Sequence, residues 1–253
     1  TDVVAQVKGG KEASVYRCTA HPSTGVDFLA AKVYRPRMFR NLRNDKMYRE
    51  GRRILGPDGK TPKERDVRLQ RALDKGTAFG AQMSHTSWLM HEYTTLDNLF
   101  RAGAAVPKPV ASSENAILMG YIGDDQLPAP ILQSVDLDPS EAKGLFDDVM
   151  HHVELLLKHD LVHGDLSAFN ILYWEGAITL IDFPQVVESK QNPHAHKIFQ
   201  RDVQRVCEYF ADQGVACDAK AIVTEMWDRY AATEPLDERA DLSRWAEENE
   251  ESE

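Results

Sequence analysis

Apolar and polar residues alternate along the first part of the chain, and this period of two predicts β-strands. The alternation covers residues 3–7, 13–18 and 28–34, which are separated by turn-forming glycine and proline residues. Apolar residues from Trp88 to Leu99 recur at helical spacing and predict a helix over about 84–102. Two further strands are expected at 106–110 and 116–119. These segments together predict an antiparallel five-stranded sheet with one helix.

The pattern changes to helices after residue 130. Asp138 is a good N-cap, Pro139 fits the first helical position, and Glu141 completes a capping box. Apolar residues then follow at helical spacing from Leu145 to Leu157, which predicts a buried core helix. The remaining predicted elements are two short strands and two helices, at 171–173, 178–181, about 194–211 and about 219–231.

This order of elements predicts an α+β fold with two lobes. The expected N-terminal lobe covers residues 1–120 and the expected, mainly helical C-terminal lobe covers 121–233, followed by an acidic tail at 234–253. Residues 35–80 are basic and interrupted by glycine and proline, so we interpret them as a mobile insertion rather than a core element.

Charge is segregated along the 253 residues, whose formal net charge is -10. Residues 35–75 hold 14 basic and 6 acidic side chains, whereas residues 234–253 hold nine acids and two arginines. The overall acidity argues against a protein that coats nucleic acid with its whole surface. The basic insertion remains a candidate site for docking a polyanion, although a solvated loop explains its charge equally well.

No apolar run approaches the roughly 20 residues that a membrane helix needs, and no signal-peptide pattern opens the sequence. Three widely spaced cysteines offer neither a disulfide framework nor a paired metal knuckle. We therefore expect a cytoplasmic protein with reduced thiols and no membrane partner.

The most informative segment is 161–170, which is followed one hairpin later by Ile181 and Asp182. Phosphoryl transfer requires a metal to neutralise phosphate charge and a carboxylate to orient the acceptor. Asp165 is the candidate base, while Asn170 and Asp182 are candidate ligands for Mg²⁺ or Mn²⁺, with Asp182 also counted as catalytic. Each residue alone suits a turn or a cap, but their spacing and flanking strands favour the catalytic interpretation.

Lys32 lies in the middle of a predicted strand, where a buried ammonium group needs an anion. The phosphates of ATP and the carboxylate of Glu92 would supply one, whereas a lysine that reaches solvent along an exposed strand is the alternative. The Gly10 to Ser14 turn lies one strand earlier, and its small residues would let backbone N–H groups approach phosphate, although a plain hairpin turn explains it almost as well.

These motifs resemble those of the RIO atypical protein kinases, and most closely the type 1 branch. The similarity covers about residues 6–215 and follows the family order. The matching segments are 10–16, Lys32, 118–123, 127–130, 163–170 and 181–185.

The resemblance implies a kinase fold without the usual peptide-binding helices, an ATPase cycle and autophosphorylation. It also implies an aspartyl-phosphate at Asp182, adenine held near the hinge, and ribosome-maturation roles in archaeal and eukaryotic members. The residues that we expect to bind the nucleotide are Gly10, Lys11, Glu12, Ala13, Ser14, Val15, Lys32, Glu92, Met119, Gly120, Ile122 and Pro128.

The sequence departs from related patterns at three places. Gly164 stands where many protein kinases have an arginine that meets a phosphorylated activation loop, so we do not expect that form of control. Gly120 replaces a common hinge acid. The insertion differs from the archaeal pattern, which is consistent with a bacterial-type member and leaves the ribosomal role open.

Two other functions fit parts of the sequence. A small-molecule kinase of the aminoglycoside phosphotransferase type would share the His163-Gly164-Asp165 loop, but it usually has more helix after the second aspartate. A nucleotide-gated assembly factor would use the basic insertion to hold ribosomal RNA or a pre-ribosomal particle. We expect the phosphate acceptor to be a protein or the chain itself.

Overall fold

Five antiparallel strands form the predicted sheet, in the order β1-β2-β3-β5-β4. The strands are β1 (Val3–Gly9), β2 (Ala13–Thr19), β3 (Phe28–Tyr34), β4 (Pro109–Ser112) and β5 (Ala116–Gly120). A short 3₁₀ turn, η1 (Pro22–Thr24), joins β2 to β3. The computed structural model describes residues 2–10, 12–35, 47, 48, 50, 52, 54–56, 59, 75 and 77–231.

The fourth strand lies farther along the chain than the sequence predicted. Residues 106–110 were expected to pair, whereas β4 begins at Pro109 and extends to Ser112. Pro107 has no N–H group to donate. The segment before Pro109 is tied to the sheet by the hydrogen bond from Gly120 N–H to the Lys108 carbonyl, at 2.8 Å. The strand therefore begins at Pro109, the second of the two alternating prolines.

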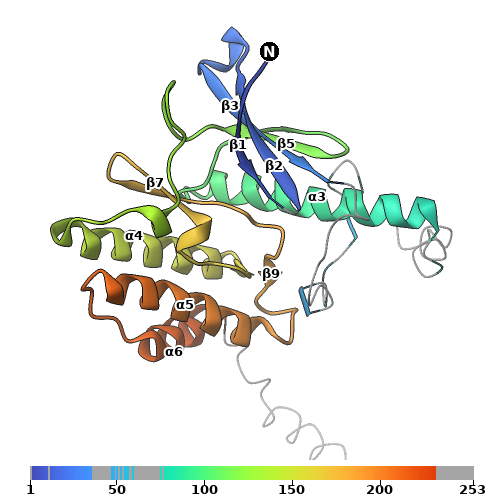
Figure 1. Ribbon diagram of the computed structural model, residues 1–253. Coiled ribbons are helices and arrows are strands. Elements are labelled where there is room, and N and C mark those ends of the chain that lie inside the picture. The colour runs from blue at the N-terminus through green and yellow to red at the C-terminus, as the bar shows by residue number, and fades with distance from the viewer. Residues whose placement is uncertain are drawn as a thin grey trace, which may run out of the picture.

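A long helix, α3 (Ala78–Arg101), crosses beneath the sheet in Figure 1. Its buried face includes Trp88, Leu89, Leu96 and Leu99. The expected start near residue 84 was wrong, because Thr77 caps the helix by accepting a hydrogen bond from Gly80 N–H. The first turns are less buried, as Phe79 is 50% exposed, and apolar periodicity is a poor guide there.

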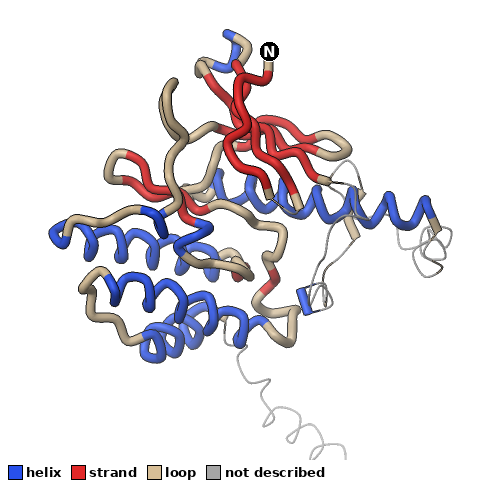
Figure 2. The backbone as a smooth tube through the Cα atoms, viewed as in Figure 1, coloured by secondary structure: helices blue, strands red, loops and turns tan. Residues whose placement is uncertain are grey.

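Helices dominate the second half of the chain, below the sheet in Figure 2. They are α4 (Pro139–Lys158), α5 (Ala195–Asp212) and α6 (Ala219–Tyr230). The capping box predicted at Asp138 and Glu141 is present. Leu145, Val149 and further apolar residues of α4 pack against α5 and α6 in the main hydrophobic core. The sheet and these helices together confirm the α+β fold predicted from the sequence.

Short strands lie between α4 and α5 and support the loops that carry polar residues. The predicted hairpin consists of β7 (Ile171–Trp174) and β8 (Ala177–Leu180). A second pair, β6 (Leu161–Val162) with β9 (Val187–Glu188), was not predicted, because two-residue strands carry no periodicity. Two 3₁₀ turns, η3 (Leu132–Ser134) and η4 (Ala168–Asn170), complete this region.

Some described residues of the insertion contact the C-terminal lobe. Met47 and Tyr48 pack against the main core, and Asn192 Nδ2 donates to the carbonyls of Met47 (2.8 Å) and Glu50 (3.0 Å). The predicted insertion also overlaps the start of α3. Met47 and Tyr48 therefore contact the core, although the sequence suggested an insertion rather than a core element for 35–80.

Most of the basic insertion and the whole acidic tail at 234–253 lie outside the described residues. Within the described part of the chain, no helix has the length and apolar character needed to cross a bilayer.

Candidate active site

A cleft of about 590 Å³ lies between the sheet, α3 and the β7–β8 hairpin. It is lined by most of the residues predicted to bind nucleotide, together with Asp182. The predicted residues on its wall are Gly10, Glu12, Ala13, Val15, Lys32, Glu92, Met119, Gly120, Ile122 and Pro128. Ser14, Asp165 and Asn170 do not line it, and Lys11 lies outside the described residues. The structure thus gathers in one cleft residues that lie far apart in the chain, from Gly10 to Asp182.

Lys32 joins the two halves of this cleft. Its Nζ lies 2.5 Å from Glu92 Oε1 on α3 and 2.5 Å from Asp182 Oδ1 after β8. The side chains of Lys32 and Glu92 are 11% and 5% exposed, whereas that of Asp182 is 43% exposed. An ammonium group has three N–H donors. Two of them are used by these carboxylates, and the third has no hydrogen-bond acceptor among the described residues.

The three charges determine one another's protonation. Burial alone would lower the pKa of Lys32, but the Asp182 and Glu92 carboxylates outweigh it and raise that pKa well above its ordinary value. Desolvation would likewise raise the pKa of Asp182, yet the Lys32 ammonium group holds it below the ordinary 3.8. Lys32 is therefore a fixed cation and Asp182 a fixed anion at neutral pH.

Tyr34 is a member of this cluster that the sequence did not single out. Its hydroxyl donates to Glu92 Oε2, so both oxygens of that buried carboxylate are engaged. Burial and the Glu92 charge raise the pKa of Tyr34 well above its ordinary value, so it remains a neutral donor. Alternation along β3 could have revealed it, because residues two apart on a strand share a face with Lys32.

The Asp165 loop lies beside the cleft and is held by Asn170. Asn170 Nδ2 donates to the Asp165 backbone oxygen at 2.8 Å and lies 3.3 Å from Asp165 Oδ2. Asn170 Oδ1 accepts no hydrogen bond from the described residues, so it is available as an oxygen ligand. The five-residue spacing between Asp165 and Asn170 thus forms a closed loop that ends in the 3₁₀ turn η4.

Gly164 has a backbone position that no other residue fits. Its φ is +88°, and an added Cβ would lie 2.0 Å from the Gln185 carbonyl oxygen. Its N–H donates to Asp202 Oδ2 at 2.8 Å, and its carbonyl accepts from Arg201 of α5. The arginine found at this position in many kinases is therefore excluded by contact with the segment after Asp182.

Buried polar side chains also hold the Asp165 loop in place. Asp202 is 2% exposed, and burial raises its pKa although His163, Arg201 and the Gly164 N–H favour its ionised form. His163 Nε2 lies 3.1 Å from the Ile181 carbonyl oxygen, which links the Asp165 loop to the residue before Asp182. Sequence patterns could not assign Asp202, because a single acid on a helix usually faces solvent.

Asp182 itself has a left-handed backbone conformation, with φ of +74°. Asp and Asn tolerate this region better than other residues that carry a Cβ atom. The Ile181 N–H donates to the Asn170 carbonyl at 3.0 Å, so the two predicted metal ligands lie on directly bonded segments. The hairpin therefore orients Asp182 towards Lys32 at the end of β8.

The opposite end of the cleft is apolar and suits an aromatic ring. Val15, Ala30, Ile131 and Leu172 line it in addition to the predicted hinge residues. The Gly120 N–H donates to Lys108 and the Ile122 carbonyl accepts from Ala129 N–H, so these two groups are already satisfied. The glycine turn is closed by a bond of 2.9 Å from Gly10 N–H to the Ala13 carbonyl.

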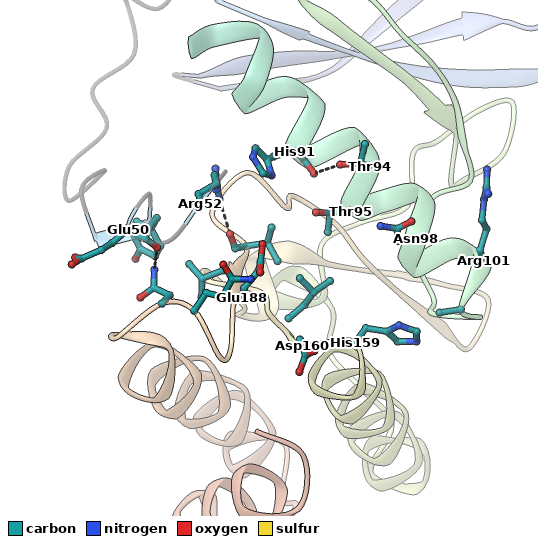
Figure 3. Close-up of a pocket in the computed structure, with 17 residues that line it drawn as sticks. Glu50, Arg52, His91, Thr94, Thr95, Asn98, Arg101, His159, Asp160 and Glu188 are labelled. Carbon is teal, nitrogen blue, oxygen red and sulfur yellow. Dashed lines mark hydrogen bonds between the residues drawn. The ribbon is translucent and has the colours of Figure 1, made fainter. Parts of the chain in front are cut away.

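A second cavity, of about 620 Å³, lies on the far side of α3 and is shown in Figure 3. His91, Thr95 and Asn98 of α3 line it, and no residue predicted to bind nucleotide or metal does. Arg52 lies at its edge and donates to the carbonyls of Pro184 (3.1 Å) and Val186 (2.6 Å). The insertion therefore contacts the segment that follows Asp182.

Comparison with known proteins identifies the same relationship that the motifs indicate. The RIO domain family matches residues 46–222. The chain is 31% identical to human serine/threonine-protein kinase RIO1 over 218 residues, which cover 85% of this chain and 34% of that protein. It is 29% identical to the Rio1 kinase of Haloferax volcanii over 221 residues, or 85% of this chain and 66% of that protein.

A third relative is the Rio1 kinase of Thermoplasma acidophilum, with 33% identity over 135 residues, 53% of this chain and 69% of that protein. The aligned part is about a third of the length of the human protein. The match to the family covers well over half of this chain, and its long alignments are to proteins named RIO1 or Rio1. This chain therefore belongs to the RIO family of atypical protein kinases, in its type 1 branch.

Proposed function

We propose that this chain is an ATP- and Mg²⁺-dependent phosphotransferase that phosphorylates serine or threonine hydroxyls, including its own, and also hydrolyses ATP. The observation that carries the proposal is Lys32, which bridges the buried Glu92 and the partly exposed Asp182 inside a cleft with an apolar end. The family membership supports the same chemistry.

In this proposal, Lys32 supplies the positive charge for the α and β phosphates of ATP. Its third N–H is available for a phosphate oxygen, while Glu92 and Tyr34 hold the side chain in place. The adenine ring occupies the apolar end near Met119. The Ile122 N–H, which donates no hydrogen bond to the described residues, is positioned to bind a ring nitrogen.

The donors near Asp182 fit a magnesium ion. Mg²⁺ prefers hard oxygen ligands and usually takes one or two protein side chains together with phosphate oxygens. The Asp182 carboxylate and the Asn170 amide oxygen would hold it, and they are the ligands predicted from the sequence. When bound, the ion neutralises phosphate charge.

Asp165 acts in this proposal on the acceptor hydroxyl. Its carboxylate is 40% exposed and lies outside the nucleotide cleft, where an acceptor can approach. Asn170 orients it through the bond to its backbone oxygen. An aspartyl-phosphate on Asp182, with water as the final acceptor, would account for the ATPase activity in this scheme.

The experiment that tests this function is a parallel measurement of phosphate release and autophosphorylation by the purified chain. Both should require Mg²⁺ and ATP, and both should fall to background in the Lys32→Met variant. Absence of phosphoryl transfer and of phosphate release from the folded wild-type chain would refute the proposal. A cytoplasmic setting is part of the same proposal.

The assembly-factor role is supported by the local charge of +8 within residues 35–75. In this role, the insertion would hold ribosomal RNA or a pre-ribosomal particle. Arg52 is a poor candidate for such a contact, because its guanidinium group donates to Pro184 and Val186. Salt-dependent RNA binding by the whole chain would test the role, and replacement of Arg49 and Arg53 should reduce the salt slope.

A further inference from the structure

The proposed base, Asp165, is paired with a cation that the phosphotransfer scheme does not use. Arg205 Nη1 of α5 lies 2.9 Å from Asp165 Oδ1, while Asn170 Nδ2 lies 3.3 Å from Oδ2. Both carboxylate oxygens are therefore engaged before any acceptor arrives. An acceptor hydroxyl that reaches Asp165 must compete with one of these donors.

Arg205 differs in its contacts from Arg201, one helical turn earlier. Arg201 donates to the Gly164 carbonyl, to Asp202 and to the Tyr48 hydroxyl, so its guanidinium group is committed to the fold. Among the described residues, Arg205 donates only to Asp165, and its side chain is 40% exposed. Its remaining N–H groups are thus available to a ligand.

The ion pair between Arg205 and Asp165 is easily exchanged for a contact with an anionic acceptor. An ion pair with both side chains 40% exposed is weak because solvent screens it, so displacement of Arg205 from Asp165 is easy. A neutral acceptor would leave the displaced guanidinium without an anion. An acceptor with its own carboxylate or phosphate would replace one ion pair by another, with bidentate geometry available to arginine.

The surface beside Asp165 also suits a polypeptide. Phe169, in the same loop, is 55% exposed although it is a large aromatic residue. Aromatic residues such as Phe are enriched in protein–protein interfaces relative to the rest of the surface. We propose that Arg205 selects polypeptide acceptors that carry a carboxylate or phosphate beside the target hydroxyl. This inference rests on the proposed protein-kinase function.

Two synthetic peptides that differ only by Glu or Gln next to one serine would test this selection. We expect the wild-type chain to prefer the Glu peptide in kcat/KM by about two- to fivefold, the range that one exposed ion pair supports. Arg205→Gln should remove the preference, and Arg205→Lys should retain part of it. Lys197→Gln, an exposed cation two turns earlier on α5, is the matched control and should leave the ratio unchanged.

A purely structural role for Arg205 would lower kcat/KM for both peptides equally and keep their ratio, which would overturn the inference. Peptide affinity, measured by calorimetry with Mg²⁺ and a non-hydrolysable ATP analogue, separates this inference from the proposed function. If no peptide is phosphorylated, the kinase proposal fails, while the affinity ratio of the two peptides still reports on Arg205. Equal affinities for the wild-type chain would overturn the inference even if Arg205→Gln does not fold.

Discussion

A methyl group at position 164 has no space in this structure. The Cβ atom of a Gly164→Ala variant would lie 2.0 Å from the Gln185 carbonyl oxygen and 2.7 Å from its carbon, and these are backbone atoms that cannot turn away. The positive φ of +88° adds a conformational penalty of about 1–2 kcal/mol. Overpacking against a fixed neighbour adds about 1–3 kcal/mol. We therefore expect a total loss of about 2–5 kcal/mol.

Gly176→Ala is the matched control, because Gly176 has a similar φ of +80° but no atom within 4 Å of an added Cβ. It should lose only the conformational part, about 1–2 kcal/mol. Urea unfolding of both variants, followed by circular dichroism, measures the difference. Equal losses for the two variants would refute the argument that contact with Gln185 excludes a side chain at position 164.

Phosphoryl transfer should also be reduced more in Gly164→Ala than in Gly176→Ala. Gly164 is bonded through its N–H to Asp202 and through its carbonyl to Arg201, so a shift of this peptide moves the neighbouring Asp165. Gly164→Ala should reduce phosphoryl transfer even where the protein remains folded, whereas Gly176→Ala should not. Transfer at wild-type rate by folded Gly164→Ala would contradict the proposed role of this loop.

Two further predictions concern the Lys32 cluster. Lys32→Met should weaken ATP binding, measured by calorimetry, by about ten- to a hundredfold, which is the range for the loss of a hydrogen bond to a charged group. The same variant should lower the free energy of unfolding by about 3–5 kcal/mol, because Glu92, which is 4% exposed, loses its cation. Unchanged affinity in a folded variant would contradict the assignment. The lowered pKa of Asp182 means that its pair with Lys32 contributes stability above the ordinary 3.8 and loses it as pH falls through the folded-state pKa. The stability difference between wild type and Asp182→Asn should thus be constant from about pH 5 to 8 and shrink in more acidic solution; a difference that grows on acidification would have the wrong sign.

Much of the architecture could be predicted because strong local signals agree with the final fold. The alternation in β3 and the capping box at Asp138 are such signals, and both elements begin where the sequence indicated. The start of α3 was missed because its first turns bury few residues. Strand β4 was misplaced because Pro107 has no N–H to donate and pairing with β5 begins only at Pro109. The β6–β9 pair depends on contacts between distant segments that no local pattern encodes.

The residues of the candidate site likewise divide into those with a signal in the sequence and those that only the folded chain reveals. Lys32 stood out because a charged residue within an apolar strand requires an anion, and Glu92 was named as a residue that could supply it. Asp182 stood out because it follows a hairpin after the Asp165–Asn170 loop. The structure brings Lys32, Glu92 and Asp182 together. Tyr34, Asp202 and Arg205 did not stand out, since their residue types are common on strands and helices. Only the folded chain shows that they contact Glu92, Gly164 and Asp165.

In the proposed mechanism, Asp182 holds Mg²⁺ against the phosphates whereas Asp165 acts on the acceptor. Calorimetric titration of a non-hydrolysable ATP analogue into Asp182→Asn and Asp165→Asn, with and without Mg²⁺, separates these two roles. Asparagine preserves the left-handed backbone at position 182, where φ is +74°. We predict that Asp182→Asn loses the Mg²⁺-dependent gain in affinity and that Asp165→Asn keeps it but transfers phosphate poorly. Loss of that gain in Asp165→Asn, with full retention in Asp182→Asn, would contradict the account.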